Sequence, residues 1–303
     1  MIGRLPKSGI KKSMALKKSG WTSIFRDHGG VVSPLKIGVL IALCLPALLL
    51  GLQAAQGALG SRPVVEAIHS TGVWSLRCLL LSLLVTPLRQ ILHWPRLMLV
   101  RRMVGVAAAV YAMLHLLLYA ADQNWRLLVV AWEIGTRVYL TVGAIALSGL
   151  LLLGVTSTNG WIRRLGGQNW RRVHRLSYGI GILALIHFTL QSKIDVSQAM
   201  LMTGFFIWLM GYRVLSRNAG SLGIGKLALL SLMACFATAI IEAAWYGLAS
   251  GAPFLLVLRA NVEPAFGWRP ALWVACAGAA LVTLRVAALR LRPAQRQNRS
   301  YGP

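Results

Sequence analysis

The sequence predicts an all-α fold, a polytopic membrane bundle of about eight transmembrane helices. Two observations carry this prediction. First, 57% of the 303 residues are hydrophobic and only 13% are charged, which is more apolar sequence than a soluble domain of this length can bury. Second, the apolar residues gather in runs long enough to cross a bilayer as helices. None of these runs alternates as a strand of a membrane barrel would.

The N-terminal stretch 1–35 is basic and contains Gly and Ser. It is similar to the n-region of a signal peptide, but the apolar run behind it has no clear small-residue cleavage site and opens a series of similar runs. We therefore expect residues 1–35 to be a cytoplasmic tail that contacts anionic lipid headgroups.

Eight apolar segments follow the tail, and each is about long enough to span the hydrocarbon layer as a helix. They are residues 36–54, 72–90, 104–121, 138–156, 173–191, 199–216, 227–247 and 271–289. Glycine and proline within them do not argue against helices, because transmembrane helices tolerate both. Pro87, near the end of the second segment, predicts a kink or an exit from the membrane.

The distribution of basic residues indicates the orientation. Twenty-five of the 32 Lys and Arg residues lie in the two terminal tails, in the even-numbered connections or at the adjoining helix ends, and six lie on the other side. By the positive-inside rule, both termini are cytoplasmic. The same rule accounts for the net charge of +25, which in a soluble protein would suggest nucleic acid. We therefore expect lipid as a partner and no nucleic acid.

Histidines inside the apolar segments are the candidate functional groups, because ionisable side chains are costly in lipid. The predicted topology places His115 and His187 at similar depth, in the outer halves of the third and fifth segments. Two imidazoles that face each other are the axial ligands that a low-spin b-type haem requires. For a single transmembrane histidine, a hydrogen-bonded packing role is the alternative.

His174 lies thirteen residues before His187, which on one straight helix is roughly 20 Å of rise and about 140° of rotation. The stretch Trp170–Phe188 thus predicts one transmembrane helix with imidazoles at two depths, and the two need not serve one pocket. Two haems, or one haem and a second role for His174, are both open.

Several short motifs, in order and at matching spacing, give the region from Glu66 to Arg217 a family resemblance. They are His69-x-Thr71-Gly72, Thr86-Pro87-Leu88, Arg101-Arg102-x-x-Gly105, His115-Leu116 with Tyr119, Glu133-Ile134-x-x-Arg137-x-Tyr139-Leu140-Thr141-x-Gly143, Thr156-Ser157-Thr158, Trp170-x-x-x-His174, Ile186-His187 and Ser192-Lys193-Ile194. With these motifs, about half of the chain resembles the MsrQ (formerly YedZ) family. Members of that family are haem-binding membrane subunits of the bacterial periplasmic methionine-sulfoxide reductase system, within the ferric-reductase-like transmembrane superfamily.

The resemblance implies an electron-transfer subunit of the bacterial inner membrane. Electrons would come from the quinone pool or a cytoplasmic flavin reductase. They would pass through b haem to a periplasmic molybdopterin methionine-sulfoxide reductase that repairs oxidised envelope proteins. His115 and His187 match the haem ligands of the family, and His174 matches a third histidine that ligates or tunes haem. FMN is also implied, but no residue here can be assigned to it.

Two further residues near the second segment are candidates for cofactor binding. His69 lies at the outer end of this segment, where contact with a haem propionate, docking of the periplasmic partner and an ordinary interfacial position are the alternatives. Arg77 is the one clear cation inside a predicted helix, and it either snorkels or pairs with a propionate. The third segment has Arg102, not His, thirteen residues before His115, so a second, inner haem would need another ligand. His93 is near enough in depth but lies outside the family pattern.

The resemblance divides the chain into the tail 1–35, a six-helix ferric-reductase-like core 36–217 and an extension 218–303. The extension carries two further spans and a basic cytoplasmic tail whose role the sequence does not indicate. No GxGxxG fingerprint and no dehydrogenase domain is found, which argues against a self-contained NADPH oxidase or ferric reductase and leaves no catalytic centre evident. Two alternatives stay open: a cytochrome b of the same superfamily that serves ferric iron or another periplasmic acceptor, and a transporter or assembly protein with structural histidines.

Overall fold

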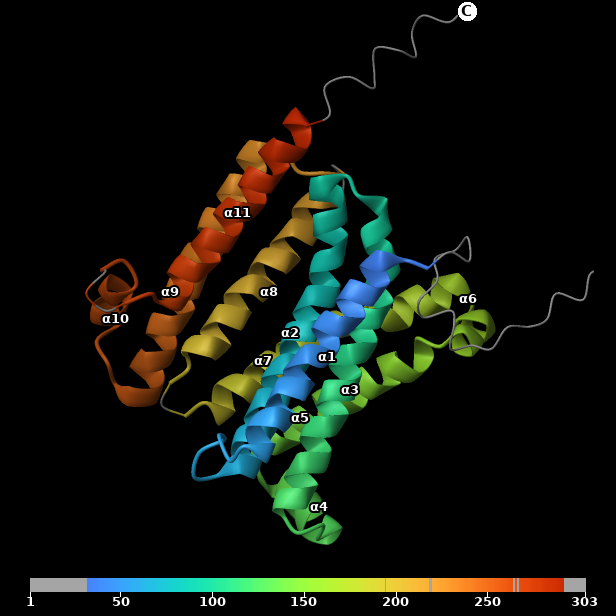
Figure 1. Ribbon diagram of the computed structural model, residues 1–303. Coiled ribbons are helices and arrows are strands. Elements are labelled where there is room, and N and C mark those ends of the chain that lie inside the picture. Colours follow the sequence, from blue (N-terminus) through green and yellow to red (C-terminus); the bar gives the residue numbers. More distant parts are fainter. Residues whose placement is uncertain (1–31, 194, 218–219, 264, 266, 292–303) are drawn as a thin grey trace, which may run out of the picture.

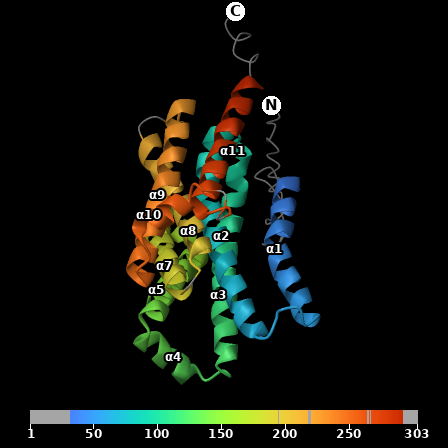
Figure 2. The same ribbon diagram turned by 90° about the vertical axis from the view of Figure 1, so that its left-hand side faces the viewer.

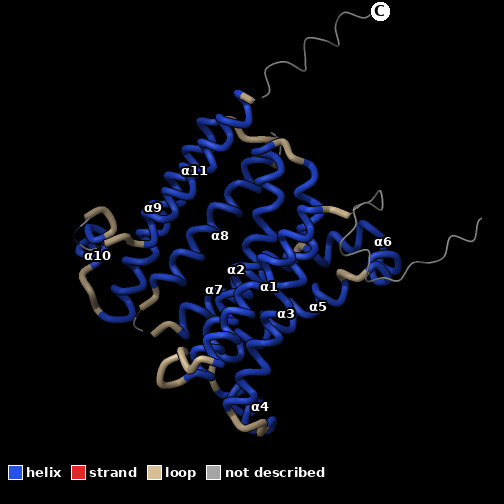
Figure 3. Tube along the Cα trace, viewed as in Figure 1, coloured by secondary structure: helices blue, strands red, loops and turns tan. Residues whose placement is uncertain are grey.

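The computed structural model describes residues 32–193, 195–217, 220–263, 265 and 267–291, and it is a helical bundle throughout this part of the chain (Figures 1 and 3). The predicted all-α fold is therefore confirmed, while most of the predicted tail 1–35 lies outside the described residues. The helices are α1 Pro34–Ala55, α2 Pro63–Leu92, α3 Met98–Asp122, α4 Leu127–Thr136, α5 Val138–Thr156, α6 Asn159–His174, α7 Leu176–Gln191, α8 Ser197–Ser216, α9 Ile224–Ser250, α10 Phe254–Ala260 and α11 Pro270–Arg290, with the 3₁₀ turn η1 Pro95–Leu97 before α3.

Within the described residues, seven helices are long and apolar enough to cross a membrane by themselves: α1, α2, α3 (together with η1), α5, α8, α9 and α11. The bent pair α6 and α7 meets the same criterion only when the two helices are taken together, which gives up to eight spans. All eight predicted segments thus coincide with helices of the structure. The sequence interpretation missed the short helices α4, α6 and α10 in the connections, because hydropathy over a span-length window registers only segments of about 20 residues.

The helix α2 is the central element of the bundle. It packs along α3 and also contacts α1, α7, α8 and α11, so apolar residues such as Leu76, Leu80 and Leu83 are buried around it. By contrast, α1 has no buried residue and lies at the edge of the bundle (Figure 2). Its attachment includes the Tyr111 hydroxyl of α3, which donates to the Leu43 carbonyl (2.7 Å) and accepts from the Ala47 amide (3.2 Å).

Pro87 does not end α2, which continues to Leu92. Proline has no N–H, so the carbonyl of Leu83, four residues earlier, loses its helical donor. The guanidinium of Arg213 on α8 donates to this carbonyl at 2.6 Å. A buried unpaired carbonyl costs free energy, and the bond from Arg213 explains why α2 tolerates proline here.

The expectation that Trp170–Phe188 forms one straight helix is wrong. Helix α6 ends at His174, α7 begins at Leu176, and the two are bent by 40°. Helix α6 is also broken internally at Gly166, whose φ of 72° lies in the left-handed region. Helix α6 lies at the right of Figure 1, and its arginines are exposed, as expected because charge is costly in lipid. His174 and His187 therefore belong to different helices.

The extension adds α9 and α11, which pack along each other and against α8. At one end of this hairpin, the fully buried Glu242 of α9 pairs with Arg269 (2.5 Å) and accepts a hydrogen bond from Asn261 (2.9 Å). At the other end, Arg285 of α11 is buried and donates to the Ile91 carbonyl in the last turn of α2 (3.1 Å). Cations stabilise helix C-termini, so Arg285 joins the hairpin to the core.

Candidate functional site

A cavity of about 860 Å³ lies among α2, α3, α5 and α7. Its walls include His115 of α3 and His187 of α7, the two histidines that the sequence placed at similar depth. The cavity also reaches the α7–α8 connection through Asp195. The bundle therefore brings the two predicted ligands together in one pocket large enough for a sizeable cofactor.

The two imidazoles face each other across this space. Their ring centres are 6.3 Å apart and their planes differ by 84°. The Nδ1 atom of His115 hydrogen-bonds to the Ile68 carbonyl (2.8 Å), and the Nδ1 atom of His187 to the Tyr139 carbonyl (2.7 Å). A carbonyl only accepts, so each Nδ1 carries the proton and each Nε2 keeps a free lone pair. Both rings are thus oriented, in the tautomer that ligates metal through Nε2.

Glycines behind the rings make this arrangement possible. A Cβ at Gly72 of α2 would lie 3.0 Å from Nδ1 of His115, and a Cβ at Gly143 of α5 would lie 2.6 Å from Nδ1 of His187. Each imidazole therefore packs directly on the backbone of a neighbouring helix, where a larger residue would displace it. The sequence interpretation quoted both glycines as motif members but assigned them no role, because only the tertiary contact shows what they accommodate.

The geometry of the pair fits a haem iron. An imidazole nitrogen that ligates a transition metal lies about 2 Å from it, which places two rings on opposite sides of one ion with centres about 6 Å apart. Across the described residues, no cluster of three or more His, Cys, Asp or Glu side chains could hold a metal ion. Two imidazoles alone suit an ion that brings its other ligands with it, as the iron of a haem does.

Polar side chains lie on the walls of the cavity beside this pair. Arg77 lines it and stacks on Trp74, with its guanidinium carbon 4.8 Å from the ring centre, and His69 lines it while exposed to solvent. Both candidates from the sequence are therefore at the cavity. Asp195 also lines it, and hydrogen bonds from Ser197 hold the pKa of this carboxyl below its ordinary value.

His174 is not brought to the cavity. Its Nε2 atom is 3.2 Å from the Ser157 hydroxyl, its Nδ1 atom is 3.1 Å from the Trp170 carbonyl, and its ring stacks on the Trp170 indole at 3.9 Å. These contacts join α6 to the end of α5 and occupy both ring nitrogens. In this structure His174, the third histidine of the family pattern, therefore packs between α5 and α6. His93, at the C-terminus of α2, contacts Arg285.

The comparisons with known proteins agree with this architecture. Residues 71–185, which contain His115 and end two residues before His187, match the family described as ferric reductase like transmembrane component. A protein-methionine-sulfoxide reductase heme-binding subunit MsrQ from Xanthomonas campestris pv. campestris (strain 8004) is 42% identical over 193 residues, which cover 60% of this chain and 86% of that relative. This chain belongs to the MsrQ family.

A second MsrQ protein, from Rhodospirillum rubrum, is 38% identical over 180 residues, which cover 59% of this chain and 86% of that relative. No solved structure matches the chain. The MsrQ resemblance found in the motifs is therefore confirmed, and so is a multi-pass membrane protein.

Proposed function

We propose that this chain is a b-haem electron-transfer subunit for a protein-methionine-sulfoxide reductase. The observation that carries the proposal is the opposed pair His115 and His187, each with its Nδ1 atom held by a backbone carbonyl and its Nε2 atom free. The names of the MsrQ relatives, heme-binding subunits of this reductase, support the same assignment.

In the proposed reaction, the protein holds the haem and orients the two imidazoles that bind it. A bound haem supplies a reversible one-electron couple between Fe(III) and Fe(II). His115 and His187 would hold the haem iron through their two Nε2 atoms, so the site would provide electron transfer and no coordination place for a substrate. The carbonyls of Ile68 and Tyr139 keep both rings in place. Fixed ligands need little reorganisation when the charge at the metal changes. Arg77 lies where it can pair with a propionate.

The position of the cavity supports a direction of transfer. His115 lies in the second half of α3 and His187 in the second half of α7, near the helix ends that lead to α4 and to the α7–α8 loop. This end of the bundle also holds the α1–α2 loop and lies opposite the α2–α3 connection (Figure 1). By the positive-inside rule, the Arg-rich end and both termini are cytoplasmic and the cavity end faces the periplasm. We therefore place the protein in the bacterial inner membrane, with a quinone or a cytoplasmic flavin reductase as donor and a periplasmic molybdopterin reductase as acceptor.

We propose a single haem, held by the core 36–217. Both ring nitrogens of His174 are in hydrogen bonds. We therefore propose that His174 holds α6 against α5 at the cytoplasmic side and does not ligate a second haem. FMN, which the family resemblance implied, has no assigned residue and no part in this proposal.

Reconstitution tests the function. The purified protein in proteoliposomes should show b-type absorption bands on addition of dithionite. The reduced haem should then be reoxidised by the periplasmic methionine-sulfoxide reductase of the same organism in the presence of a methionine-sulfoxide peptide. Absence of the bands would refute every haem-based function and favour a transporter or assembly protein. Reoxidation by ferric citrate but not by the reductase would favour the ferric-reductase alternative.

A further inference from the structure

The connection between α4 and α5 is a sharp elbow with one residue at its corner. Helix α4 ends at Thr136 and α5 begins at Val138, so only Arg137 lies between them, with extended backbone angles (φ −107°, ψ 110°). No side chain caps the N-terminus of α5. The direction of its first turn therefore depends on contacts made across the elbow.

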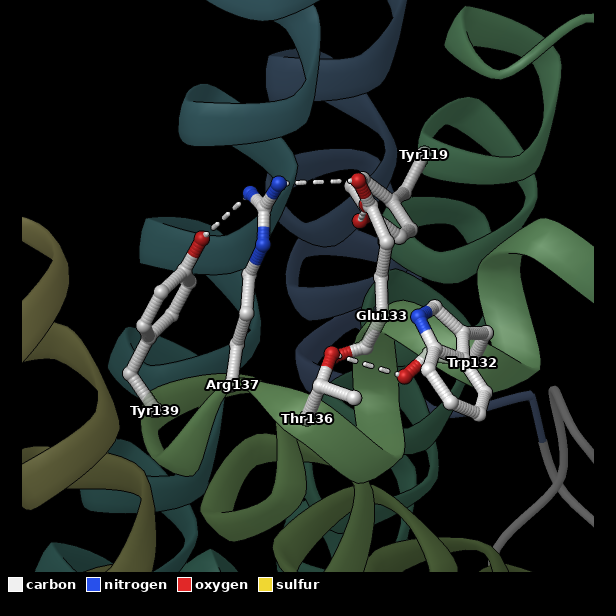
Figure 4. Close-up of polar contacts among 6 residues, drawn as sticks. All are labelled: Tyr119, Trp132, Glu133, Thr136, Arg137 and Tyr139. Carbon is white, nitrogen blue, oxygen red and sulfur yellow. Dashed lines mark hydrogen bonds and ion pairs between the residues drawn. The ribbon is translucent and has the colours of Figure 1, made fainter.

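Arg137 makes two such contacts, which Figure 4 shows. Its guanidinium pairs with Glu133 in the last turn of α4 (2.9 Å) and donates to the Tyr139 hydroxyl in the first turn of α5 (3.3 Å). The hydroxyl of Tyr119, on α3, donates to the second carboxylate oxygen of Glu133. These hydrogen bonds form a continuous network that links α3, α4 and α5 at the end of the bundle that holds the cavity. The Tyr139 hydroxyl and the Glu133 carboxylate raise the pKa of Arg137, so the guanidinium stays charged.

Thr141 adds a second link across the elbow. Its hydroxyl donates to the Ile134 carbonyl of α4 at 2.5 Å. Together with the Arg137 contacts, this bond sets the first turn of α5 relative to α4.

The first turn of α5 carries the carbonyl that orients His187. The Tyr139 carbonyl accepts the bond from Nδ1 of His187 (2.7 Å), and the Tyr139 ring stacks on the imidazole at 6.4 Å and 27°. The other cavity histidine differs in this respect. His115 donates to Ile68, a residue inside the continuous 30-residue helix α2. Tyr139, by contrast, is the second residue of α5 and follows the elbow directly, so the position of its carbonyl depends on how α5 starts.

We propose that Arg137, with Glu133 and Thr141, is a positioning residue that holds the Tyr139 carbonyl against Nδ1 of His187 and thereby lowers the reduction potential of the haem. The inference rests on the proposed haem function. An exposed ion pair adds little to stability, and Arg137 is 51% exposed, so a substitution of Arg137 should leave the protein folded. A hydrogen bond to the distal N–H makes a ligating imidazole more basic, which favours Fe(III) over Fe(II).

Positioning and simple charge predict opposite signs. If Arg137 acts through the carbonyl, its removal loosens the bond, makes His187 less basic and raises the midpoint potential. If Arg137 acts only as a nearby cation, its removal favours the more positive Fe(III) state and lowers the potential. Thr141→Val also distinguishes the positioning effect from the charge effect, because it breaks the link across the elbow without a change in charge.

The experiment is a redox titration of the haem-loaded protein in nanodiscs. Arg137→Ala and Thr141→Val should each raise the reduced-to-oxidised ratio at a fixed potential by about tenfold, which is 59 mV for a one-electron couple. The matched control is Arg126→Ala, which removes an exposed arginine from the α3–α4 connection, at the other end of α4, where its side chain donates to the Gln123 carbonyl. Its potential should stay the same or fall.

Electron paramagnetic resonance of the ferric form gives an independent measure of ring orientation. The near-perpendicular rings, at 84°, predict a highly anisotropic low-spin signal in the wild type. Rotation of His187 in the Arg137→Ala and Thr141→Val proteins should make this signal more rhombic.

A potential that falls in Arg137→Ala, or an unchanged potential and spectrum in Thr141→Val, would overturn the inference. If Arg137→Ala does not accumulate, Thr141→Val decides alone. A wild type without haem would instead refute the proposed function.

Discussion

At the scale of single residues, the site depends on two glycines as much as on its two histidines. Gly72 and Gly143 have no Cβ, and this lets two imidazoles lie against helix backbones and point into one cavity. The approach at Gly143 is the closer of the two, with a Cβ placed 2.6 Å from Nδ1 of His187 against 3.0 Å for His115 at Gly72. The His187 side should therefore tolerate extra volume least.

Alanine substitution tests this asymmetry. Gly143→Ala should displace His187, at a cost of about 1–3 kcal/mol from overpacking, and should lower the haem-to-protein ratio more than Gly72→Ala does. Gly179→Ala on α7 is the control, because no described atom outside its own stretch of helix lies within 4 Å of a Cβ there, and its haem content should equal that of the wild type. Equal haem content in Gly143→Ala and Gly179→Ala would contradict the packing argument.

At the scale of helices, hydropathy predicted every span but not how the spans bend and connect. The depth match of His115 and His187 followed from orientation and residue count alone, since lipid fixes where each helix enters and leaves. The bend between His174 and Leu176 did not follow, because it depends on contacts such as that of His174 with Ser157. Such tertiary contacts leave no periodicity in the sequence.

Helix α2 offers a prediction at this scale. Arg213→Met should leave the Leu83 carbonyl unpaired and destabilise the protein by about 1–3 kcal/mol. Pro87→Ala restores the missing N–H, so Arg213→Met should cost less in that background. Thermal unfolding in detergent of the two single variants and the double variant measures this coupling, with the exposed Arg217→Met as control. Strictly additive effects would show that Arg213 does not compensate for Pro87.

At the scale of the whole molecule, the extension braces the core without entering the site. The described cavity walls end at Gln198 on α8, so α9 and α11 contribute nothing to them. The hairpin instead holds its own end with Glu242 and Arg269 and joins α2 through Arg285. The sequence could not indicate this role, since an isolated acid in an apolar span shows its partner only in three dimensions.

Because the extension stabilises the bundle but does not line the cavity, a substitution in it should lower the stability of the protein and leave the haem properties unchanged. Glu242→Ala removes the carboxylate that accepts hydrogen bonds from Arg269 and from the buried Asn261 and should cost about 1–3 kcal/mol, seen as a lower melting temperature in detergent. The haem spectrum and midpoint potential should stay as in the wild type. Glu263→Ala removes an exposed acid from the neighbouring connection and should change neither property. A shifted haem potential in Glu242→Ala would show that the extension acts on the site.

The most direct test of the central claim is the haem content of purified His115→Ala, His187→Ala and His174→Ala, measured as haem per polypeptide. We expect one haem per chain in the wild type and in His174→Ala, and none in His115→Ala or His187→Ala. Full occupancy in either of the latter two, or two haems per wild-type chain, would contradict a single haem held between His115 and His187.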